Sequence, residues 1–283
     1  MIDGLIPLAE HSPTTVAELS AIVKAARVAG HAVYPVGGRT MTGFGLPPTK
    51  PGVAVDLTRL NQVIDYPARD MTVTVQAGIR LAELQAVLAT ENQELPVDVP
   101  LPDRATLGGS IAVNASGPRR FGCGTLRDYV IGITLMNDEG EAFKAGGRVV
   151  KNVAGYDIMK LATGSLGTLG VITQVTLKVK PKAGASEWLA LPCPEAEVPM
   201  VLGILNRTRT RPSAVVLTVA GPDRNHRRLR GQSAGRRVAS HPVARRVTRR
   251  PALPLGRSPA ARGRAPAGGP ARLPFIGHAS RHV

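Results

Sequence analysis

The chain has 283 residues, a formal net charge of +16 and 43% hydrophobic residues. No apolar run approaches the roughly 20 residues of a membrane-spanning helix, and the N-terminal residues lack the pattern of a signal peptide. Two cysteines, Cys123 and Cys193, are too few for a disulfide framework or a cysteine-bound metal cluster. We therefore expect a protein of the reducing cytoplasm without a metal site.

The positive charge is confined to one end of the chain. Residues 1–220 contain 21 Lys and Arg against 19 Asp and Glu, whereas residues 221–283 contain 15 arginines and one acidic residue, Asp223. The sequence therefore predicts a near-neutral folded part followed by a stretch of different character.

The first elements alternate between helix and strand. Residues 14–30 carry apolar side chains at helical spacing, with Thr15 and Glu18 in the pattern of a capping box and Gly30 as a stop signal. They predict a surface helix that packs on a sheet. Residues 31–36 predict a strand that leads into a glycine-containing loop.

That loop, GGRTMTGFG at 37–45, is a candidate anion site. A strand that runs into glycines can direct successive backbone N–H groups at a phosphate, and Arg39 and Thr40 could add a charge and a hydroxyl. The loop lacks the Walker A pattern, and after Gly43 and Gly45 no third glycine or helix of a Rossmann fingerprint follows. From the loop alone, a phosphate cradle and a plain turn are equally open.

The middle of the chain predicts further strands and helices. In chain order they are strands at 53–57, 62–66 and 71–77, an amphipathic helix within 77–95, an extended proline-punctuated segment at 96–105, a hairpin at 129–147 and an alternating strand at 171–181. The lysines at 178, 180 and 182 indicate a solvated sheet edge for the last strand. Residues 198–208 predict a helix and 213–221 a strand.

Thirteen glycines lie between Gly108 and Gly170, where an average usage of about 7% predicts four or five. Because a glycine inside an element costs about 0.5–1 kcal/mol, this density predicts left-handed backbone or close approach of the backbone to another group, and the exposed backbone can hold an anionic cofactor. A loop-rich β segment whose glycines only turn corners is the alternative. Asn114 is a candidate partner for a ring edge, or a turn residue. Arg119 and Arg120 are candidates for a phosphate or an acidic substrate, or solvated charges.

Three motifs occur in a fixed order: PVGGRTMTGFG at 35–45, TLGGSIAVNASGPRRFGCGTLRDYVIG at 106–132, and KNVAGYDIMKLATGSLGTLGVIT at 151–173. In this combination, residues 10–182 resemble the FAD-binding domain of the vanillyl-alcohol-oxidase/para-cresol-methylhydroxylase (PCMH) type. Within that superfamily, the GPRR and KNVAGYD segments are most similar to the FAD-binding (E) subunit of glycolate oxidase, also called glycolate dehydrogenase.

The resemblance implies an α+β fold with FAD extended between two sub-domains. It implies an FAD-binding PCMH-type domain of two α+β sub-domains at 1–182 and the start of a truncated cap domain at 183–221. The first glycine loop would wrap the pyrophosphate, the TLGGS turn and Gly117 would approach the flavin and phosphate side, and the GVI segment would face the adenine half. The implied cofactor-binding residues are Val36, Gly37, Gly38, Arg39, Thr40, Thr106, Gly108, Gly109, Ser110, Gly117, Gly170, Val171 and Ile172.

The resemblance also implies a reaction. A 2-hydroxy acid such as glycolate would transfer a hydride to FAD, and the electrons would pass to an iron–sulfur subunit. None of the six histidines lies in a glycine loop, so we expect non-covalent FAD. No catalytic base is assigned. The segment 151–157 offers four possible site residues that are equally plausible as packing supports: Lys151, Asn152, Tyr156 and Asp157.

Two alternatives to that function are open. One is a related D-lactate-type dehydrogenase, and the other is a non-catalytic flavin-binding or structural subunit that supports a separate catalytic flavoprotein. The expected partners are a catalytic flavoprotein subunit and an iron–sulfur subunit of the same complex, and a small-molecule 2-hydroxy acid. The expected location is the cytoplasm, with peripheral attachment to the inner membrane through partner subunits left open.

The stretch 222–283 has eight prolines, no lysine, no glutamate and no apolar period, and it predicts disorder. It could be an arginine-rich nucleic-acid arm, a linker or targeting tail, or the out-of-frame translation of a GC-rich gene. The body contains no nucleic-acid module, so we expect no nucleic-acid partner. Arginine, proline, alanine and glycine have GC-rich codons, and the composition therefore favours the frameshift interpretation.

Overall fold

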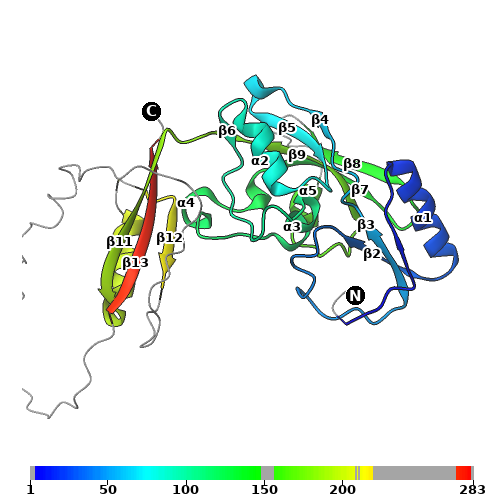
Figure 1. The fold of residues 1–283 in the computed structure, drawn as a ribbon, viewed down its shortest axis with the longest axis horizontal. Helices are drawn as coiled ribbons and strands as arrows, with labels where there is room; N and C mark the ends of the chain where they lie inside the picture. The colour runs from blue at the N-terminus through cyan, green and yellow to red at the C-terminus, as the bar shows by residue number, and fades with distance from the viewer. Residues whose placement is uncertain (1–3, 148–155, 208, 210, 219–271, 282–283) are drawn as a thin grey trace, which may run out of the picture.

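The computed structural model describes residues 4–147, 156–207, 209 and 211–218, and the backbone of 272–281. Two lobes form the main body, and a smaller unit lies beside it (Figure 1). We call this smaller unit the distal unit; it comprises residues 185–218 together with the backbone strand 272–281.

The first lobe is a three-stranded parallel sheet in the order β1-β3-β2, with one helix against it. Its elements are β1 (Ala9–His11), α1 (Val16–Val28), β2 (Ala32–Val36) and β3 (Gly52–Asp56). The predicted helix start is confirmed, because the Thr15 side chain accepts a hydrogen bond from the Glu18 N–H at 3.1 Å. The Glu18 carboxylate reaches one residue further back than a capping box requires, to the Thr14 N–H at 2.7 Å.

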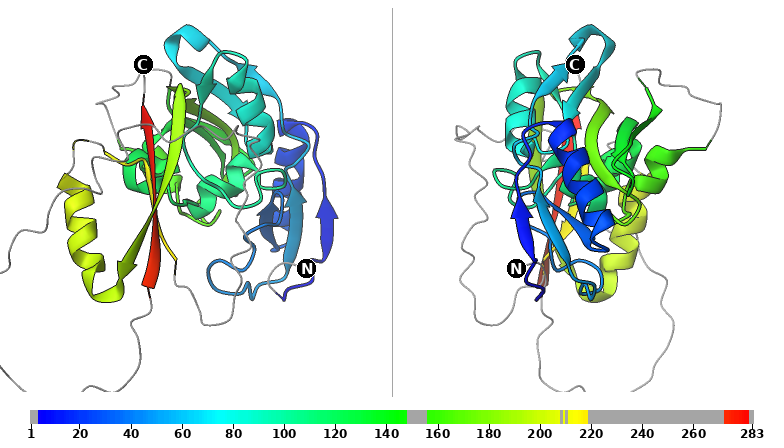
Figure 2. Two further views of the ribbon diagram at one scale, coloured as in Figure 1. Left: turned by 60° about the vertical axis from the view of Figure 1, so that its left-hand side comes forward. Right: turned by 90° about the vertical axis from the view of Figure 1, so that its right-hand side faces the viewer.

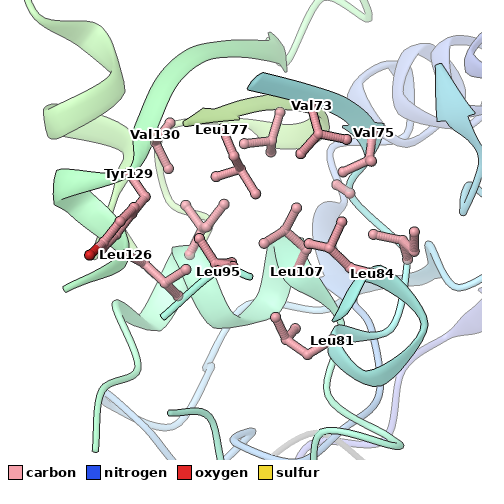
Figure 3. Close-up of a cluster of buried hydrophobic side chains, with 14 of the residues drawn as sticks. Val73, Val75, Leu81, Leu84, Leu95, Leu107, Leu126, Tyr129, Val130 and Leu177 are labelled. Carbon is pink, nitrogen blue, oxygen red and sulfur yellow. The ribbon is translucent and has the colours of Figure 1, made fainter. Parts of the chain in front are cut away.

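The second lobe is built on a five-stranded sheet in the order β4-β5-β9-β7-β8, in which all pairs are antiparallel. The strands are β4 (Val63–Asp65), β5 (Thr72–Gln76), β7 (Val130–Met136), β8 (Ala142–Gly146) and β9 (Val171–Lys178). The helices are α2 (Leu81–Ala89), α3 (Leu107–Val113) and α5 (Ile158–Ala162). Figure 3 shows the core, where α2 and α3 bury Leu84 and Leu107 against Val75 and Leu177 of the sheet.

Short elements connect these parts. They are η1 (Ala68–Asp70), β6 (Gln93–Glu94), which pairs with β10 (Lys180–Pro181), α4 (Arg120–Cys123) and η2 (Leu126–Asp128).

The predicted solvated edge at 171–181 is wrong. Strand β9 is central in its sheet, with β5 on one side and β7 on the other. Lys178 and Lys180 instead place their ammonium groups 5.8 and 5.7 Å from the centre of the Tyr129 ring. Both faces of β9 are largely buried: Val175 and Leu177 are buried on one face, and Thr176 on the other. A central strand of this kind does not show the simple alternation of an edge strand.

The distal unit is a three-stranded sheet in the order β11-β13-β12 with α6 packed along it, as Figure 2 shows. Its elements are β11 (Ala185–Pro194), η3 (Glu195–Glu197), α6 (Val198–Arg207), β12 (Ala214–Leu217) and β13 (Arg272–Arg281). The helix and strand predicted at 198–208 and 213–221 are present at α6 and β12.

Strand β13 corrects the predicted disorder for ten residues of the stretch 222–283. Its backbone pairs with β11 along its whole length and with four residues of β12. Because β11 and β12 do not pair with each other, a third strand is required to satisfy the backbone groups that face the gap. Residues 222–271 and 282–283 lie outside the described residues.

The two lobes of the main body share a core on one flank. Met136 of β7 and Val171 of β9 are buried together with Leu19 and Val23 of α1 and Val55 of β3. On the same flank, the Ser20 hydroxyl donates to the Gly140 carbonyl oxygen at 2.6 Å. The lobes are thus joined by burial and by a hydrogen bond through the turn between β7 and β8.

Candidate functional site

A cavity of ≈ 60 Å³ lies where the two lobes meet. Three segments that are distant in the sequence converge on it: the end of β2 with the following glycine, the first half of α3, and the turn that leads into β9. The lining residues are Pro35, Val36, Gly37, Leu57, Ala77, Thr106, Gly108, Gly109, Ala112, Leu166, Gly167, Gly170 and Ile172. Each of the three motifs from the sequence therefore contributes a wall.

The first wall requires glycine because the loop after β2 presses against the segment before α3. A Cβ atom on Gly37 would stand 2.0 Å from Thr106 Oγ1, and one on Gly38 would stand 1.7 Å from the Arg104 carbonyl oxygen. Both distances are far below van der Waals contact, so neither position accepts a side chain without movement of the backbone. The glycines of this loop thus allow close approach of one backbone segment to another.

The same loop offers hydrogen-bond donors. Within the described part of the chain, no group accepts a hydrogen bond from the backbone N–H of Gly37, Gly38, Arg39 or Thr40. Successive free N–H groups in a turn form a concavity that suits an anion. Among the described residues, the loop therefore keeps unpaired the donors that a phosphate cradle needs.

The second wall, at the start of α3, differs from the first because its hydrogen-bond donors already have partners within the protein. The Gly108 N–H donates to the Ala77 carbonyl oxygen at 2.7 Å, and the Gly109 N–H donates to Thr106 Oγ1 at 3.4 Å. The Ser110 N–H and hydroxyl both bind the Thr106 carbonyl oxygen. These donors are used within the protein, so the TLGGS turn shapes the cavity and leaves donation to the first loop.

Arg39 holds an unusual backbone conformation beside the cavity. Its φ of 54° lies in the left-handed region, which costs a residue with a side chain about 1–2 kcal/mol. Its guanidinium forms an ion pair with Glu10 of β1. The structure thus keeps a charged side chain at a position where glycine would be less strained.

The third wall is the turn before β9. Gly170 has a φ of 146°, and a Cβ atom there would stand 2.7 Å from the Met136 carbonyl oxygen. Gly167, with a φ of 77°, lies against Pro35 of β2. Ile172 lines the cavity, whereas the Val171 side chain is part of the core shared by the lobes.

Seven of the thirteen predicted cofactor-binding residues line the cavity: Val36, Gly37, Thr106, Gly108, Gly109, Gly170 and Ile172. The other six are not in its lining: Gly38, Arg39 and Thr40 lie in the loop, Ser110 and Val171 in the core, and Gly117 against Asp98. The sequence did not single out six further lining residues: Pro35, Leu57, Ala77, Ala112, Leu166 and Gly167. For Leu166 and Gly167 the glycine-rich GSLGTLG run was the available signal.

Other candidates have ordinary partners or lie elsewhere. Asp157 caps α5, accepting from the Lys160 N–H at 3.0 Å. The Lys160 ammonium, 2.7 Å from Asp157 Oδ2, is the main cause that keeps the pKa of the Asp157 carboxyl below its ordinary value. Tyr156 is fully exposed, and Lys151 and Asn152 lie outside the described residues. Asn114 ends α3 in the left-handed conformation, and its buried Oδ1 has no hydrogen-bond partner within the described residues.

His11 and His31 line a separate groove between α1 and β3. Neither belongs to the lining of the cavity. Over the described ranges, His, Cys, Asp and Glu side chains form no cluster of three that could hold a metal ion. In the same ranges, no helix has the length and apolar character to cross a membrane.

Comparison with known proteins agrees with this geometry. A family model described as an FAD binding domain matches residues 7–146, which include two of the three cavity walls. A D-2-hydroxyglutarate dehydrogenase of Xanthomonas citri pv. viticola is 34% identical over 72% of this chain and 43% of the relative. The glycolate oxidase subunit GlcE of Escherichia coli is 36% identical over 53% of this chain and 43% of the relative.

A D-lactate dehydrogenase of Archaeoglobus fulgidus is 32% identical over 65% of this chain and 41% of the relative. This chain thus spans less than half the length of these relatives. A solved structure of an alkyldihydroxyacetonephosphate synthase superposes with a TM-score of 0.62 at 24% identity, over 72% of this chain and 37% of that one, and shares the fold. By the matched model, residues 7–146 of the chain belong to the FAD binding domain family.

Proposed function

We propose that this chain carries FAD in a dehydrogenase that oxidises a 2-hydroxy acid. The observation that carries the proposal is the convergence of the three glycine-rich walls on one cavity, next to the free N–H groups of residues 37–40. The substrate class is supported by the relatives, whose printed names refer to D-2-hydroxyglutarate, glycolate and D-lactate.

The residues present fit FAD in two respects. Gly37, Gly108 and Gly109 line the cavity with backbone and no side chain, while the faces that their Cβ atoms would occupy pack against Thr106 and Ala77. The free N–H groups and the Arg39 guanidinium suit the pyrophosphate, which carries the negative charge of FAD. At ≈ 60 Å³ the cavity is smaller than the roughly 300 Å³ of typical ligand pockets, so it can enclose only part of the cofactor.

When bound, FAD supplies a two-electron acceptor for the substrate hydride. The loop 37–40 binds the phosphates, α3 and the turn before β9 exclude water from the enclosed part, and Asn114 Oδ1 offers a buried acceptor for a ring N–H. Non-covalent attachment is part of the proposal, because His11 and His31 lie in the separate groove.

The cavity itself has no acid or base. None of its lining residues has a titratable side chain, so groups that hold the substrate and take its hydroxyl proton come from elsewhere. This observation favours the second candidate function, a flavin-binding subunit that supports a separate catalytic flavoprotein. We also propose assembly with a catalytic flavoprotein and an iron–sulfur subunit in the cytoplasm. The relative whose printed name is that of a glycolate oxidase subunit supports a multi-subunit assembly.

The proposal places the FAD-binding domain at residues 1–182 and the start of the cap domain at 183–221. They are supported by the change of sheet between β10, which ends at Pro181 and pairs with β6, and β11, which begins at Ala185 in the distal unit.

The test is the visible absorption spectrum of the purified chain, recorded before and after acid precipitation. A flavin spectrum that moves to the supernatant supports non-covalent FAD, and colour in the pellet contradicts it. Anaerobic addition of glycolate, D-lactate or D-2-hydroxyglutarate should bleach the flavin of a catalytic chain. A flavin that is bleached by dithionite and by none of the three acids supports the non-catalytic subunit. A folded chain that binds no FAD would refute both functions.

A further inference from the structure

The short helix α4 lies at the edge of the main body and faces the distal unit (Figure 1). It has only four residues, and none of them is buried. A helix of one turn without a buried face is not stable through propensity or hydrophobic burial. Polar contacts at both ends hold it in place instead.

The N-terminal end is fixed through Arg119. Its backbone N–H and Nε donate to the two oxygens of Asp98 at 2.7 and 2.8 Å, and Nη1 donates to Glu94 Oε2 at 3.0 Å. Burial works to lower the pKa of Arg119, but the hydrogen bond and charge of Asp98, and then Glu94, raise it, so the guanidinium is permanently charged. Asp98 also packs on Gly117, where a Cβ atom would stand 2.6 Å from Asp98 Cβ.

The C-terminal end is fixed through Tyr129. This side chain is 1% exposed, and its hydroxyl donates to the Cys123 carbonyl oxygen at 2.6 Å. Burial raises the pKa of Tyr129, which keeps the hydroxyl protonated and able to donate at neutral pH.

Between these ends, Gly122 contacts the distal unit through backbone alone. Its N–H donates to the Ser213 carbonyl oxygen at 3.0 Å. A Cβ atom on Gly122 would stand 2.6 Å from Ser213 Cα and 2.7 Å from the Pro212 carbonyl oxygen. Ser213 is buried and directly precedes β12, so this contact ties the edge of the distal sheet to α4.

We propose that α4 is the joint that sets the distal unit against the segment that follows the cavity-lining helix α3, with Arg119 and Gly122 as its positioning residues. The five-residue stretch 119–123 contacts Asp98, and thereby Gly117, through Arg119 and contacts Ser213 through Gly122. Its relation to FAD rests on the proposed function. Because the cavity has no titratable lining, the groups that hold a 2-hydroxy acid must approach from outside it, and the joint fixes where the distal unit can place them.

The test is hydrogen exchange by mass spectrometry on the full chain without added FAD. Gly122→Ala should accelerate exchange about tenfold or more in peptides covering 211–217, while peptides from β5 and β9 remain protected. Alanine is a better helix former than glycine, so the loss cannot come from α4 itself. Gly184→Ala is the matched control, since a Cβ atom there meets nothing within 4 Å.

If Gly122→Ala does not fold, a second pair of variants tests the proposal independently: Arg119→Gln and Arg119→Lys. Arg119→Gln should accelerate exchange at 211–217 and also weaken FAD binding, by about tenfold, because a charge-assisted network is lost. Arg119→Lys keeps the charge and should restore part of both effects, which a purely structural loss of side-chain volume would not predict.

If protection from hydrogen exchange at 211–217 is unchanged in both Gly122→Ala and Arg119→Gln, the proposal that α4 is a joint is refuted. Equal acceleration in Gly184→Ala also overturns it, since the effect would then be non-specific. A wild-type chain that binds no FAD but loses protection at 211–217 in Gly122→Ala refutes the proposed function and supports the joint. The two failures are therefore distinguishable.

Discussion

Gly37 and Thr106 lie in such close contact that a Cβ atom on Gly37 would stand 2.0 Å from Thr106 Oγ1. Thr106 caps α3, and Gly37 begins the loop whose N–H groups are free. The contact therefore couples the loop of the first lobe to the helix of the second at the wall of the cavity.

The first prediction concerns this contact. Gly37→Ala should abolish measurable FAD binding and lower the free energy of unfolding by about 1–3 kcal/mol, because the added methyl forces the loop away from α3. FAD binding is measured by quenching of flavin fluorescence, and stability by urea unfolding of the chain without FAD. Gly109→Ala, with a Cβ distance of 3.2 Å to the same oxygen, should have a smaller effect, and Gly203→Ala, with open space, none on FAD binding. Equal effects of the three variants would contradict the contact.

The second prediction separates the two roles of Arg39. In Arg39→Gly, relief of the left-handed conformation should raise stability by about 1–2 kcal/mol. Loss of the partly exposed pair with Glu10 should lower it by at most about 1 kcal/mol, so stability should be unchanged or slightly higher. FAD affinity should fall on the order of tenfold, and its dependence on salt should become shallower. Titrations at two salt concentrations measure both. Arg27→Ala, which removes an exposed pair on α1, should leave both unchanged; an unaltered Kd in Arg39→Gly would remove Arg39 from the phosphate site.

The third prediction concerns acid stability. The Thr125 N–H, at 2.7 Å, and then the Thr125 hydroxyl hold the pKa of the Asp128 carboxyl below its usual 3.8. A carboxyl with a lowered folded pKa stabilises the protein above the unfolded pKa, and this contribution is lost as the pH falls through the folded value. The stability difference between wild type and Asp128→Asn should therefore shrink below about pH 4.

Urea unfolding at neutral pH and in acid measures this difference. Thr125→Val should preserve most of the effect, because the backbone N–H is the larger cause of the lowered pKa. A difference that is constant across the acid range would show that Asp128 titrates alike in the folded and unfolded chain.

The fourth prediction concerns Tyr129. Tyr129→Phe leaves the Cys123 carbonyl oxygen without its donor and should cost about 1–2 kcal/mol of unfolding free energy. Because the folded pKa is raised, wild type should also lose stability as the pH rises above about 10, and the variant should lose less. Alkaline urea unfolding compares the two. Tyr156→Phe, at a fully exposed tyrosine, is the control and should behave as wild type.

Local signals were sufficient for much of the fold. The helix at 16–28 follows from its apolar spacing, from Thr15 at its start and from Gly30, with a φ of 69°, after its end. The hairpin of β7 and β8 follows from two apolar runs around a turn at Gly140. Each of these features is decided by residues within one or two turns of each other, so the sequence shows them directly.

The remaining features depend on contacts between distant residues. Leu57 and Ala77 line the cavity only because β3 and β5 end beside α3, and neither residue type indicates a site. Strand β11 was not predicted, because Pro192 and Pro194 suggest a loop unless a neighbouring strand is known. The motifs identified which segments meet. They did not show that the loop 37–40 keeps its N–H groups unpaired within the described chain while those at the start of α3 are bonded within the protein, because this depends on contacts between distant residues.

The core that Met136 and Val171 share with α1 has a consequence for how the cofactor is acquired. Neither lobe can be cut from the other without exposing these side chains to water, so the two lobes form one folding unit before any ligand arrives. FAD is therefore expected to enter a cavity that is already formed, so its binding energy is not used to bring the lobes together. We expect uptake by docking, with a small heat-capacity change, in contrast to folding around the ligand.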